Sequence, residues 1–324
     1  MPNANLLLRV ANTALALIGA KLVRNHSNGN DAELSRQLQL EPQNAVKELR
    51  KKAIVIDEYF TPPERSERLH LSAINTRITN WYDTDKSHIL GMLQEAAALV
   101  DFYAKIPLQE ADDSTSPRWC NDFMGAMDAI SLYSMVKKHN PRLYVECGSG
   151  NSTKFVARAI QDHGLRTKII SIDPYPRAEV DTLCHEIIRT PLQHMDLDFF
   201  KSLTSEDIFI FDGSHRAFSN SDVTVFMTEL LPEFPSGLLY AIHDICLPDD
   251  YPDVWVVEEQ RYYNEQYLLA CYLLGGAMGD TIEMPLKFLS FQPDVQQVFA
   301  SVWGKDAPLE KATPGACFFW MRKG

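Results

Sequence analysis

The chain has 324 residues, of which 45% are hydrophobic and 23% charged, so it can form one or two globular domains with a sizeable core. Its formal net charge of −12 argues against nucleic acid as the main partner, because phosphate backbones attract basic surfaces. The six cysteines form no CxxC pair, which excludes a zinc knuckle and a thioredoxin-type motif and favours a reducing, cytoplasmic location.

The N-terminal region shows helical patterns and no strand alternation. The apolar stretch at residues 6–18 is shorter than the ~20 residues that span a bilayer, so we expect no transmembrane segment. An amphipathic helix packed on the protein is favoured there over a helix on a membrane surface. Helical spacing recurs over 31–52 and 88–103, and residues 111–117 are polar and typical of a linker. Residues 1–117 are therefore predicted to be a mostly helical accessory region.

From residue 118 onwards, short apolar runs alternate with helical patterns. Continuous apolar strands separated by helices indicate a parallel sheet covered on both faces, and two final strands without a full helix between them indicate an antiparallel hairpin at one edge. The prediction is an α/β, Rossmann-like domain over 118–324. Strands are expected at 143–147, 168–172, 187–188, 208–211, 238–242, 285–291 and 317–321, and helices at 152–163, 220–231 and 259–274.

A glycine loop leaves the first of these strands and enters a helix. Gly148 and Gly150 allow a tight turn and the close approach of a ligand, and the helix start presents free N–H groups. Asp173 ends the next strand, where a carboxylate can accept hydrogen bonds from both hydroxyls of a ribose. A nucleoside-containing cofactor is therefore favoured over a mere tight turn. Thr153 stands where a dinucleotide fingerprint needs a third glycine, which disfavours NAD.

Four segments together resemble one branch of the class I S-adenosylmethionine-dependent methyltransferases: ECGSGNSTK at 146–154, SIDPYPR at 171–177, FDGSH at 211–215 and IHDI at 242–245. The segments 261–267 and 318–320 fit the same branch. The resemblance implies S-adenosylmethionine as the cofactor, with its ribose held by Asp173 and its adenine flanked by Gln193. It implies that the remaining cofactor contacts come from Glu146, Gly148, Ser149, Gly150, Asn151, Ser152 and Asp212.

Two polar clusters follow the strands at 208–211 and 238–242, and the carboxyl ends of neighbouring parallel strands form the active-site edge of such sheets. Asp212 and His215 make one cluster, and His243 and Asp244 the other. We predict these four residues to be catalytic, with His215 as the general base, because an unperturbed histidine titrates near pH ~6.5. The alternatives are that the two aspartates only cap helices or bind loop amides, and that His243 is a core histidine.

The same residues leave open whether the protein binds a metal ion. Some relatives that methylate sugars hold Mg²⁺ with an acid at the position of Asp212 and an acidic pair after the following strand. The first member of that pair is His243 here, and Mg²⁺ prefers oxygen ligands, so the expected ligand set of Asp212, His243 and Asp244 departs from the pattern.

The predicted activity is methylation of a hydroxyl on a small molecule or sugar. A hydroxylase-like tailoring enzyme on the same fold and a non-catalytic binding module remain alternatives, and homo-oligomerisation is left open. Residues ahead of the first strand are candidates to close over the cofactor: Trp119, Asn121 and Asp128. Candidates to contact an acceptor, with packing or solvated surface as the alternative, are Tyr175, Arg177, Tyr262 and Tyr263.

Overall fold

The computed structural model describes residues 21–22, 55–56, 71–109, 113–121, 123–176, 179–259, 261–312 and 315–324. The chain forms two compact units, one of Met1–Ser66 with Asp253–Arg261 and one of Glu67–Pro252 with Tyr262–Gly324. In the first unit, β1 (Lys21–Leu22) pairs antiparallel with β2 (Val55–Ile56), and η4 spans Val254–Glu258. The helices predicted at 6–18 and 31–52 and the position of Arg177 lie outside the described residues.

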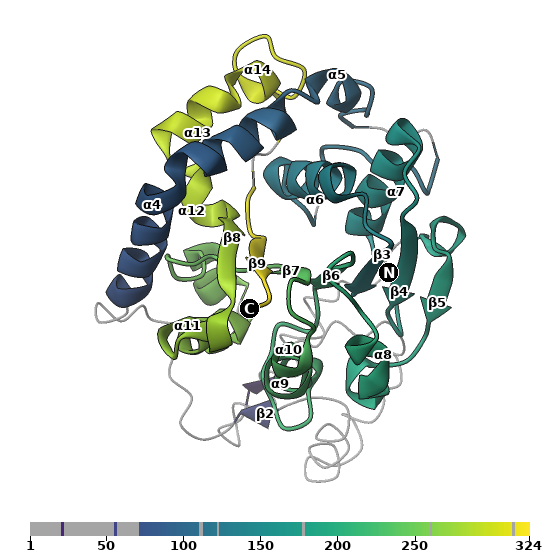
Figure 1. Ribbon diagram of the computed structural model, residues 1–324, viewed down its shortest axis with the longest axis vertical. Coiled ribbons are helices and arrows are strands. Elements are labelled where there is room, and N and C mark those ends of the chain that lie inside the picture. The colour runs from purple at the N-terminus through teal and green to yellow at the C-terminus, as the bar shows by residue number, and fades with distance from the viewer. Residues whose placement is uncertain are drawn as a thin grey trace. The chain divides into compact units, whose positions relative to one another are not determined.

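A seven-stranded sheet organises the second unit, in the order β5-β4-β3-β6-β7-β9-β8 (Figure 1). The first five strands in this order run parallel, whereas β9 is antiparallel to both β7 and β8. In chain order, the first strand of this sheet is β3, and the next two, β4 and β5, extend it to one edge. The chain then returns to place β6 on the other side of β3, so β3 and β6 flank the switch point of the sheet. The strands are β3 (Leu143–Cys147), β4 (Lys168–Ile172), β5 (Glu186–Ile188), β6 (Ile208–Phe211), β7 (Leu239–Ile242), β8 (Thr281–Pro285) and β9 (Phe319–Arg322).

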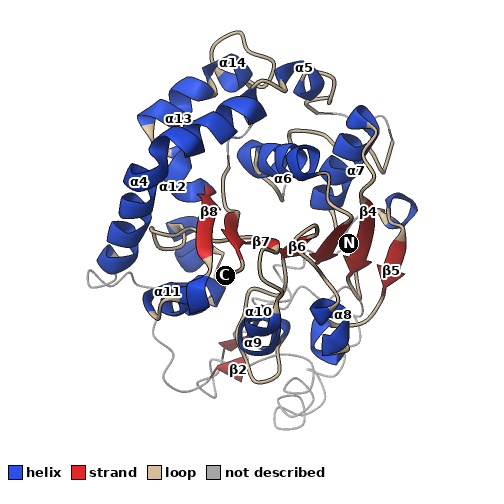
Figure 2. Ribbon diagram, viewed as in Figure 1, coloured by secondary structure: helices blue, strands red, loops and turns tan. Residues whose placement is uncertain are grey.

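Helices cover both faces of this sheet (Figure 2). On one face lie α6 (Ala126–His139) and α7 (Asn151–His163), and on the other lie α8 (Leu197–Lys201) and the continuous segment α9 (Asp222–Val225), η3 (Phe226–Leu230) and α10 (Leu231–Glu233). Every residue of β6 and β7 is buried, which is why these strands read as unbroken apolar runs. The α/β, Rossmann-like prediction with an antiparallel C-terminal edge is confirmed.

Residues ahead of position 118 also contribute to the core of the second unit. The helix α4 (Ser72–Ala97) contacts α6, α11, α13 and β8, and it buries Ile74, Ile78 and Leu93. The boundary at 117/118 stays a prediction. The remaining helices are α5 (Val100–Tyr103), η1 (Asp181–Leu183), η2 (Leu192–His194), α11 (Glu265–Leu274), η5 (Ala277–Gly279), α12 (Leu286–Ser290), α13 (Pro293–Val298) and α14 (Ala300–Trp303). Among the described residues, no helix is both long and apolar enough to cross a membrane.

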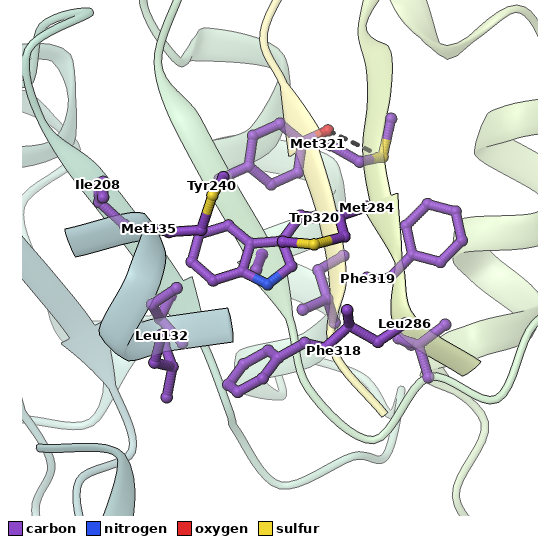
Figure 3. Close-up of a cluster of buried hydrophobic side chains, with 14 of the residues drawn as sticks. Leu132, Met135, Ile208, Tyr240, Met284, Leu286, Phe318, Phe319, Trp320 and Met321 are labelled. Carbon is purple, nitrogen blue, oxygen red and sulfur yellow. Dashed lines mark hydrogen bonds between the residues drawn. The ribbon is translucent and has the colours of Figure 1, made fainter. Parts of the chain in front are cut away.

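The indole of Trp320 on β9 lies at the centre of a buried cluster to which α6 contributes Leu132 and Met135 and β8 contributes Met284 (Figure 3). Trp320 is fully buried, and its indole N–H donates to the Ser131 hydroxyl at 3.1 Å. This contact satisfies the one polar group of a large aromatic side chain. The cluster therefore fixes β9, and with it the segment that leads into the candidate site, against α6.

Two predicted elements differ from the structure. The strand predicted at 285–291 is wrong: Leu286–Ser290 is the helix α12, and the strand β8 precedes it at Thr281–Pro285. A short apolar run of this kind fits a buried helical turn as well as a strand. The helix predicted from Glu259 begins instead at Glu265, because Tyr262 adopts a left-handed conformation (φ 54°) and Asn264 has a non-helical φ of −144°.

Candidate functional site

The glycine loop passes very close to the end of β6. Gly148 has a left-handed φ of 86°, and a Cβ atom there would lie 1.9 Å from the carbonyl oxygen of Asp212. Two hydrogen bonds hold the same point of the sheet, from the Gly148 N–H to the Ile172 carbonyl (3.0 Å) and from the Asp212 N–H to the Cys147 carbonyl (2.8 Å). Glycine is required at position 148 for both reasons, conformation and space.

Glu146, near the end of β3, is fully buried and organises the start of α7. Its carboxylate accepts hydrogen bonds from the hydroxyls of Ser152 (2.9 Å), Thr153 and Tyr144 (3.2 Å). Burial raises the pKa of this carboxyl to about 7, although the three hydroxyls favour its charged form. Glu146 thus stabilises the loop through its hydrogen bonds to the first residues of α7. Its predicted contact with a cofactor stays a prediction.

Asp173 holds the other side of the loop. One carboxylate oxygen accepts the N–H of Ser149 at 2.8 Å, and the other accepts the N–H of Tyr175 at 2.8 Å. Asp173 is half-buried, so free lone pairs of its oxygens remain accessible to hydroxyl donors. Gln193 lies in η2 and is also half-buried. Their roles toward ribose and adenine stay predictions.

A cavity of about 310 Å³ opens beside the glycine loop. Its wall brings together Ser149–Ser152 of the predicted loop and the first catalytic residue of each cluster, Asp212 and His243. The other predicted site residues do not line it: Glu146, Gly148, Asp173, Gln193, His215 and Asp244. Sequence reasoning missed most of the remaining wall, including part of the segment predicted as a linker. The lining residues are Asp113, Ser114, Ser116, Arg118, Asn121, Phe123, Met124, Ser149, Gly150, Asn151, Ser152, Lys154, Asp212, His243 and Phe318.

The segment at 113–121 is fixed to the start of α7. The ammonium group of Lys154 donates to the Ser114 carbonyl at 2.5 Å, and the Asn151 amide donates to the Asn121 side chain at 3.0 Å. Asn121, weighed from the sequence as a residue that closes over the cofactor, therefore does contribute to the cavity wall. Trp119 instead is buried, with its indole N–H bonded to the Tyr103 carbonyl at 3.0 Å.

His215 is surrounded by three carboxylates. Its Nδ1 lies 2.6 Å from a carboxylate oxygen of Glu265, and its Nε2 lies 3.4 Å from Asp212 and 3.5 Å from Asp244. The first distance is a short hydrogen bond, whereas the other two are ion-pair distances. The structure therefore places two of the other three predicted catalytic residues, Asp212 and Asp244, around the His215 imidazole, and it adds Glu265, which sequence reasoning missed.

His243 has a parallel arrangement. Its Nδ1 lies 3.4 Å from Asp212 and 3.6 Å from Asp244, and its Nε2 lies 3.6 Å from Asp128. Asp128 also accepts the backbone N–H groups of Cys317 (2.7 Å) and Phe318 (2.8 Å) through its other oxygen. His243 faces acids and the cavity rather than only apolar neighbours, although its ring also lies 4.4 Å from that of Phe318.

The carboxylates hold both imidazoles in their charged form. Burial opposes protonation of His215, but the three carboxylates outweigh it, Glu265 most strongly, and raise its pKa to about 9. Burial opposes protonation of His243 as well, and Asp212 and Asp244 outweigh it, so its pKa lies well above the ordinary value. At neutral pH the protein without ligands therefore carries two imidazolium groups: His243, which lines the cavity, and His215, which contacts the cavity-lining Asp212 but does not itself line the cavity.

Backbone conformation is unusual at the same place. His215 (φ 62°), Asp244 (φ 56°) and Tyr262 (φ 54°) all adopt left-handed conformations. Such residues cost about 1–3 kcal/mol each and persist only where the surroundings hold them. Their concentration around one pair of imidazoles supports a functional role for this edge of the sheet.

The predicted metal ligands do not form a metal site. Across the residues that the structure describes, no three His, Cys, Asp or Glu side chains are arranged to hold a metal ion. Asp212 instead lies between two imidazoles, 3.4 Å from each, so its charge is balanced by histidine. Asp212, His243 and Asp244 therefore do not fit Mg²⁺ as a group.

Residues 145–245 match the family described as "Methyltransferase domain". No curated protein matches the chain. Among solved structures, the chain is similar to the plantazolicin methyltransferase BpumL in complex with SAH, at 12% identity over 87% of this chain and 98% of that chain, with a TM-score of 0.39. It is also similar to the O-methyltransferase TomG from Streptomyces achromogenes in complex with SAM, at 13% identity over 70% and 96%, with a TM-score of 0.37. Residues 145–245, which run from within β3 to just past β7 of the sheet, therefore match a methyltransferase domain.

Proposed function

We propose that the protein transfers a methyl group from S-adenosylmethionine to a hydroxyl group of a small molecule or sugar. The observation that carries this proposal is the shared wall of one cavity. Ser149, Gly150, Asn151 and Ser152 of the glycine loop line it together with Asp212 and His243. A donor site and acid–base groups therefore occupy the same space, as alignment of two reactants requires.

The residues present fit such a donor. When bound, S-adenosylmethionine supplies a methyl group on a positively charged sulfur. Gly150 lines the cavity with open space where a Cβ atom would stand, and the half-buried carboxylate of Asp173 offers the acceptors that a nucleoside needs. Asp212 adds a negative charge to the cavity wall, and its side chain keeps 32% of its exposure. An accessible carboxylate in a partly enclosed cavity favours a cationic ligand.

His215 is the proposed general base. A hydroxyl oxygen is a poor nucleophile until its proton is removed. His215 is protonated at neutral pH in the protein without ligands, so it can accept that proton only after the cationic donor near Asp212 has lowered its pKa and displaced its own proton. Asp212, Asp244 and Glu265 then stabilise the imidazolium that forms. The proposed residues act by orienting the acceptor and holding the proton, and we propose no metal ion for this step.

The proposal also covers the class of acceptor, the cellular location and the role of the N-terminal region. The acceptor is proposed to be a small molecule, and nucleic acid is not proposed as a partner because the net charge is −12. All six cysteines are free thiols, which supports a reducing, cytoplasmic location. Residues 1–117 are proposed to be an accessory region.

The proposal is tested with a panel of sugars and polyketide-like hydroxyl compounds, incubated with the protein and S-adenosylmethionine and resolved by product mass. Addition of one CH₂ unit, lost in His215→Asn and retained in the surface variant Asp198→Asn, supports it. Addition of an oxygen atom to an acceptor would instead identify the hydroxylase-like alternative. A panel that shows no donor consumption and no donor binding would contradict the proposed function.

A further inference from the structure

Two consecutive residues at the start of α11 hold His215. The N–H of Asn264 donates to the His215 carbonyl at 3.0 Å, and the Asn264 side chain accepts the N–H of Ala217 at 2.7 Å. Glu265 then binds the imidazole itself, with 2.6 Å between its carboxylate oxygen and Nδ1. The backbone and the ring of His215 are therefore both held from one helix turn.

Among the described residues, the side chain of Glu265 forms a hydrogen bond with His215 alone. The residue is 2% exposed, and its second carboxylate oxygen is buried without a hydrogen-bond partner. An ionised carboxylate in such a place is unfavourable unless a charge or a hydrogen bond compensates it. The hydrogen bond to His215 supplies that compensation, so the two side chains depend on each other.

The helix turn that carries Glu265 is itself anchored. Gln266 accepts the N–H of Cys246 at 3.0 Å and donates through its amide to Asp250 at 3.2 Å, and its N–H donates to the Tyr251 hydroxyl at 3.3 Å. These contacts tie the start of α11 to the loop that follows β7. The backbone that carries Glu265 is thus held by contacts that do not involve His215, as is required of a residue that sets the orientation of another.

We propose that Glu265 is a positioning residue that fixes the His215 ring, with Nδ1 as the donor to Glu265 and Nε2 presented toward Asp212 and Asp244. This inference rests on the proposed function, because it assigns His215 its reacting nitrogen. The groups that face His215 come from four segments. Asp212 follows β6, Asp244 follows β7, Glu265 belongs to α11, and the ring of Tyr263 lies 4.4 Å from the imidazole ring.

The experiment compares the wild type with Glu265→Gln, Glu265→Asp and the surface control Glu229→Gln. Glutamine keeps an acceptor for Nδ1 but removes the charge, so Glu265→Gln is expected to lower the His215 pKa, measured by NMR titration of the imidazole. We expect kcat at pH 7 to fall roughly 10–100-fold, as for other residues that orient a reacting group, while the dissociation constant of the donor changes less than about twofold. Glu265→Asp is expected to recover part of kcat, and Glu229→Gln to match the wild type.

Three results would overturn the inference. One is an unchanged His215 titration in Glu265→Gln, and another is unchanged turnover despite a shifted titration. The third is a loss of turnover that follows a parallel loss of donor affinity and thermal stability in both Glu265 variants, because a purely structural residue would behave in this way. The imidazole titration requires no turnover, so a protein that methylates nothing but shows the expected shift contradicts the proposed function and leaves the pairing of Glu265 with His215 intact.

Discussion

His215 and His243 are joined through a single carboxylate oxygen, Oδ1 of Asp212, which lies 3.4 Å from Nε2 of one imidazole and 3.4 Å from Nδ1 of the other. Asp244 makes a second, looser bridge between the same two rings at 3.5 and 3.6 Å. The result is an alternating series of acids and imidazoles along the edge of the sheet. Because Asp212 also lines the cavity, a ligand charge placed there acts on both imidazoles at once.

Asp212→Asn should weaken the binding of S-adenosylmethionine more than the binding of S-adenosylhomocysteine. The first ligand has a cationic sulfur and the second a neutral one, so only the first loses a charge–charge attraction. We expect the ratio of the two dissociation constants to change by roughly tenfold, equivalent to ~1.4 kcal/mol. Isothermal titration calorimetry with both ligands checks this, with Asp198→Asn as the control. An equal increase in both dissociation constants would show that Asp212 does not interact with the charge on the sulfur.

Binding of the donor should release protons near pH 8. His215 has a pKa of about 9 and is therefore mostly protonated at that pH, and a positive charge near Asp212 lowers this pKa. Titrations in buffers of different ionisation enthalpy measure the number of protons released. S-adenosylmethionine is expected to release more than S-adenosylhomocysteine. Identical release for both ligands would show that the imidazoles do not sense the ligand charge.

His215 should stabilise the fold at acidic and neutral pH more than at alkaline pH. Its folded pKa of about 9 is raised above the ordinary value of 6.5, so its contribution is fully present below pH ~6.5 and is lost as the pH rises through about 9. The free energies of unfolding of the wild type and His215→Asn are expected to differ by ~3 kcal/mol more at pH 6 than at pH 10. A constant difference across denaturant titrations at these pH values would contradict the charged imidazole.

Gly148→Ala should destabilise the fold, whereas Gly150→Ala should act chiefly on the ligand. The new Cβ at position 148 meets the Asp212 carbonyl and requires a left-handed conformation, so we expect a loss of about 2–3 kcal/mol. At position 150 no atom lies within 4 Å of the new Cβ, and Gly150 lines the cavity. Thermal unfolding and donor calorimetry on both variants check this. A Gly150→Ala variant less stable than Gly148→Ala would be inconsistent with the loop geometry.

The parts of the fold that sequence predicts well are those with local causes. The apolar runs at 143–147, 168–172 and 208–211 coincide with β3, β4 and β6, because buried parallel strands need unbroken apolar residues. The predicted helix after the glycine loop begins one residue earlier than expected and ends at the left-handed Gly164, as predicted. The prediction at Leu286–Ser290 fails for the opposite reason, because a five-residue segment with three apolar residues is too short to distinguish a helical period from a strand period.

The part of the site that sequence reasoning missed depends on long-range contacts. Glu265 lies 50 residues from His215 along the chain, and nothing around it distinguishes it from other acidic residues in the first turn of a helix. The wall residues Asp113, Ser114 and Ser116 resemble a polar linker because their neighbours at the start of α7 come later in the chain. The site residues that the sequence does predict either follow the end of a predicted strand or belong to the glycine loop.

The most direct test of the account is a crystal structure of the protein soaked with S-adenosylhomocysteine. Electron density for the ligand is expected in the cavity beside Ser149–Ser152, with the ribose hydroxyls bonded to Asp173 and the sulfur on the side of Asp212. Density for the ligand elsewhere on the protein, or its absence from crystals grown at saturating ligand, would contradict the central claim that this cavity holds the methyl donor.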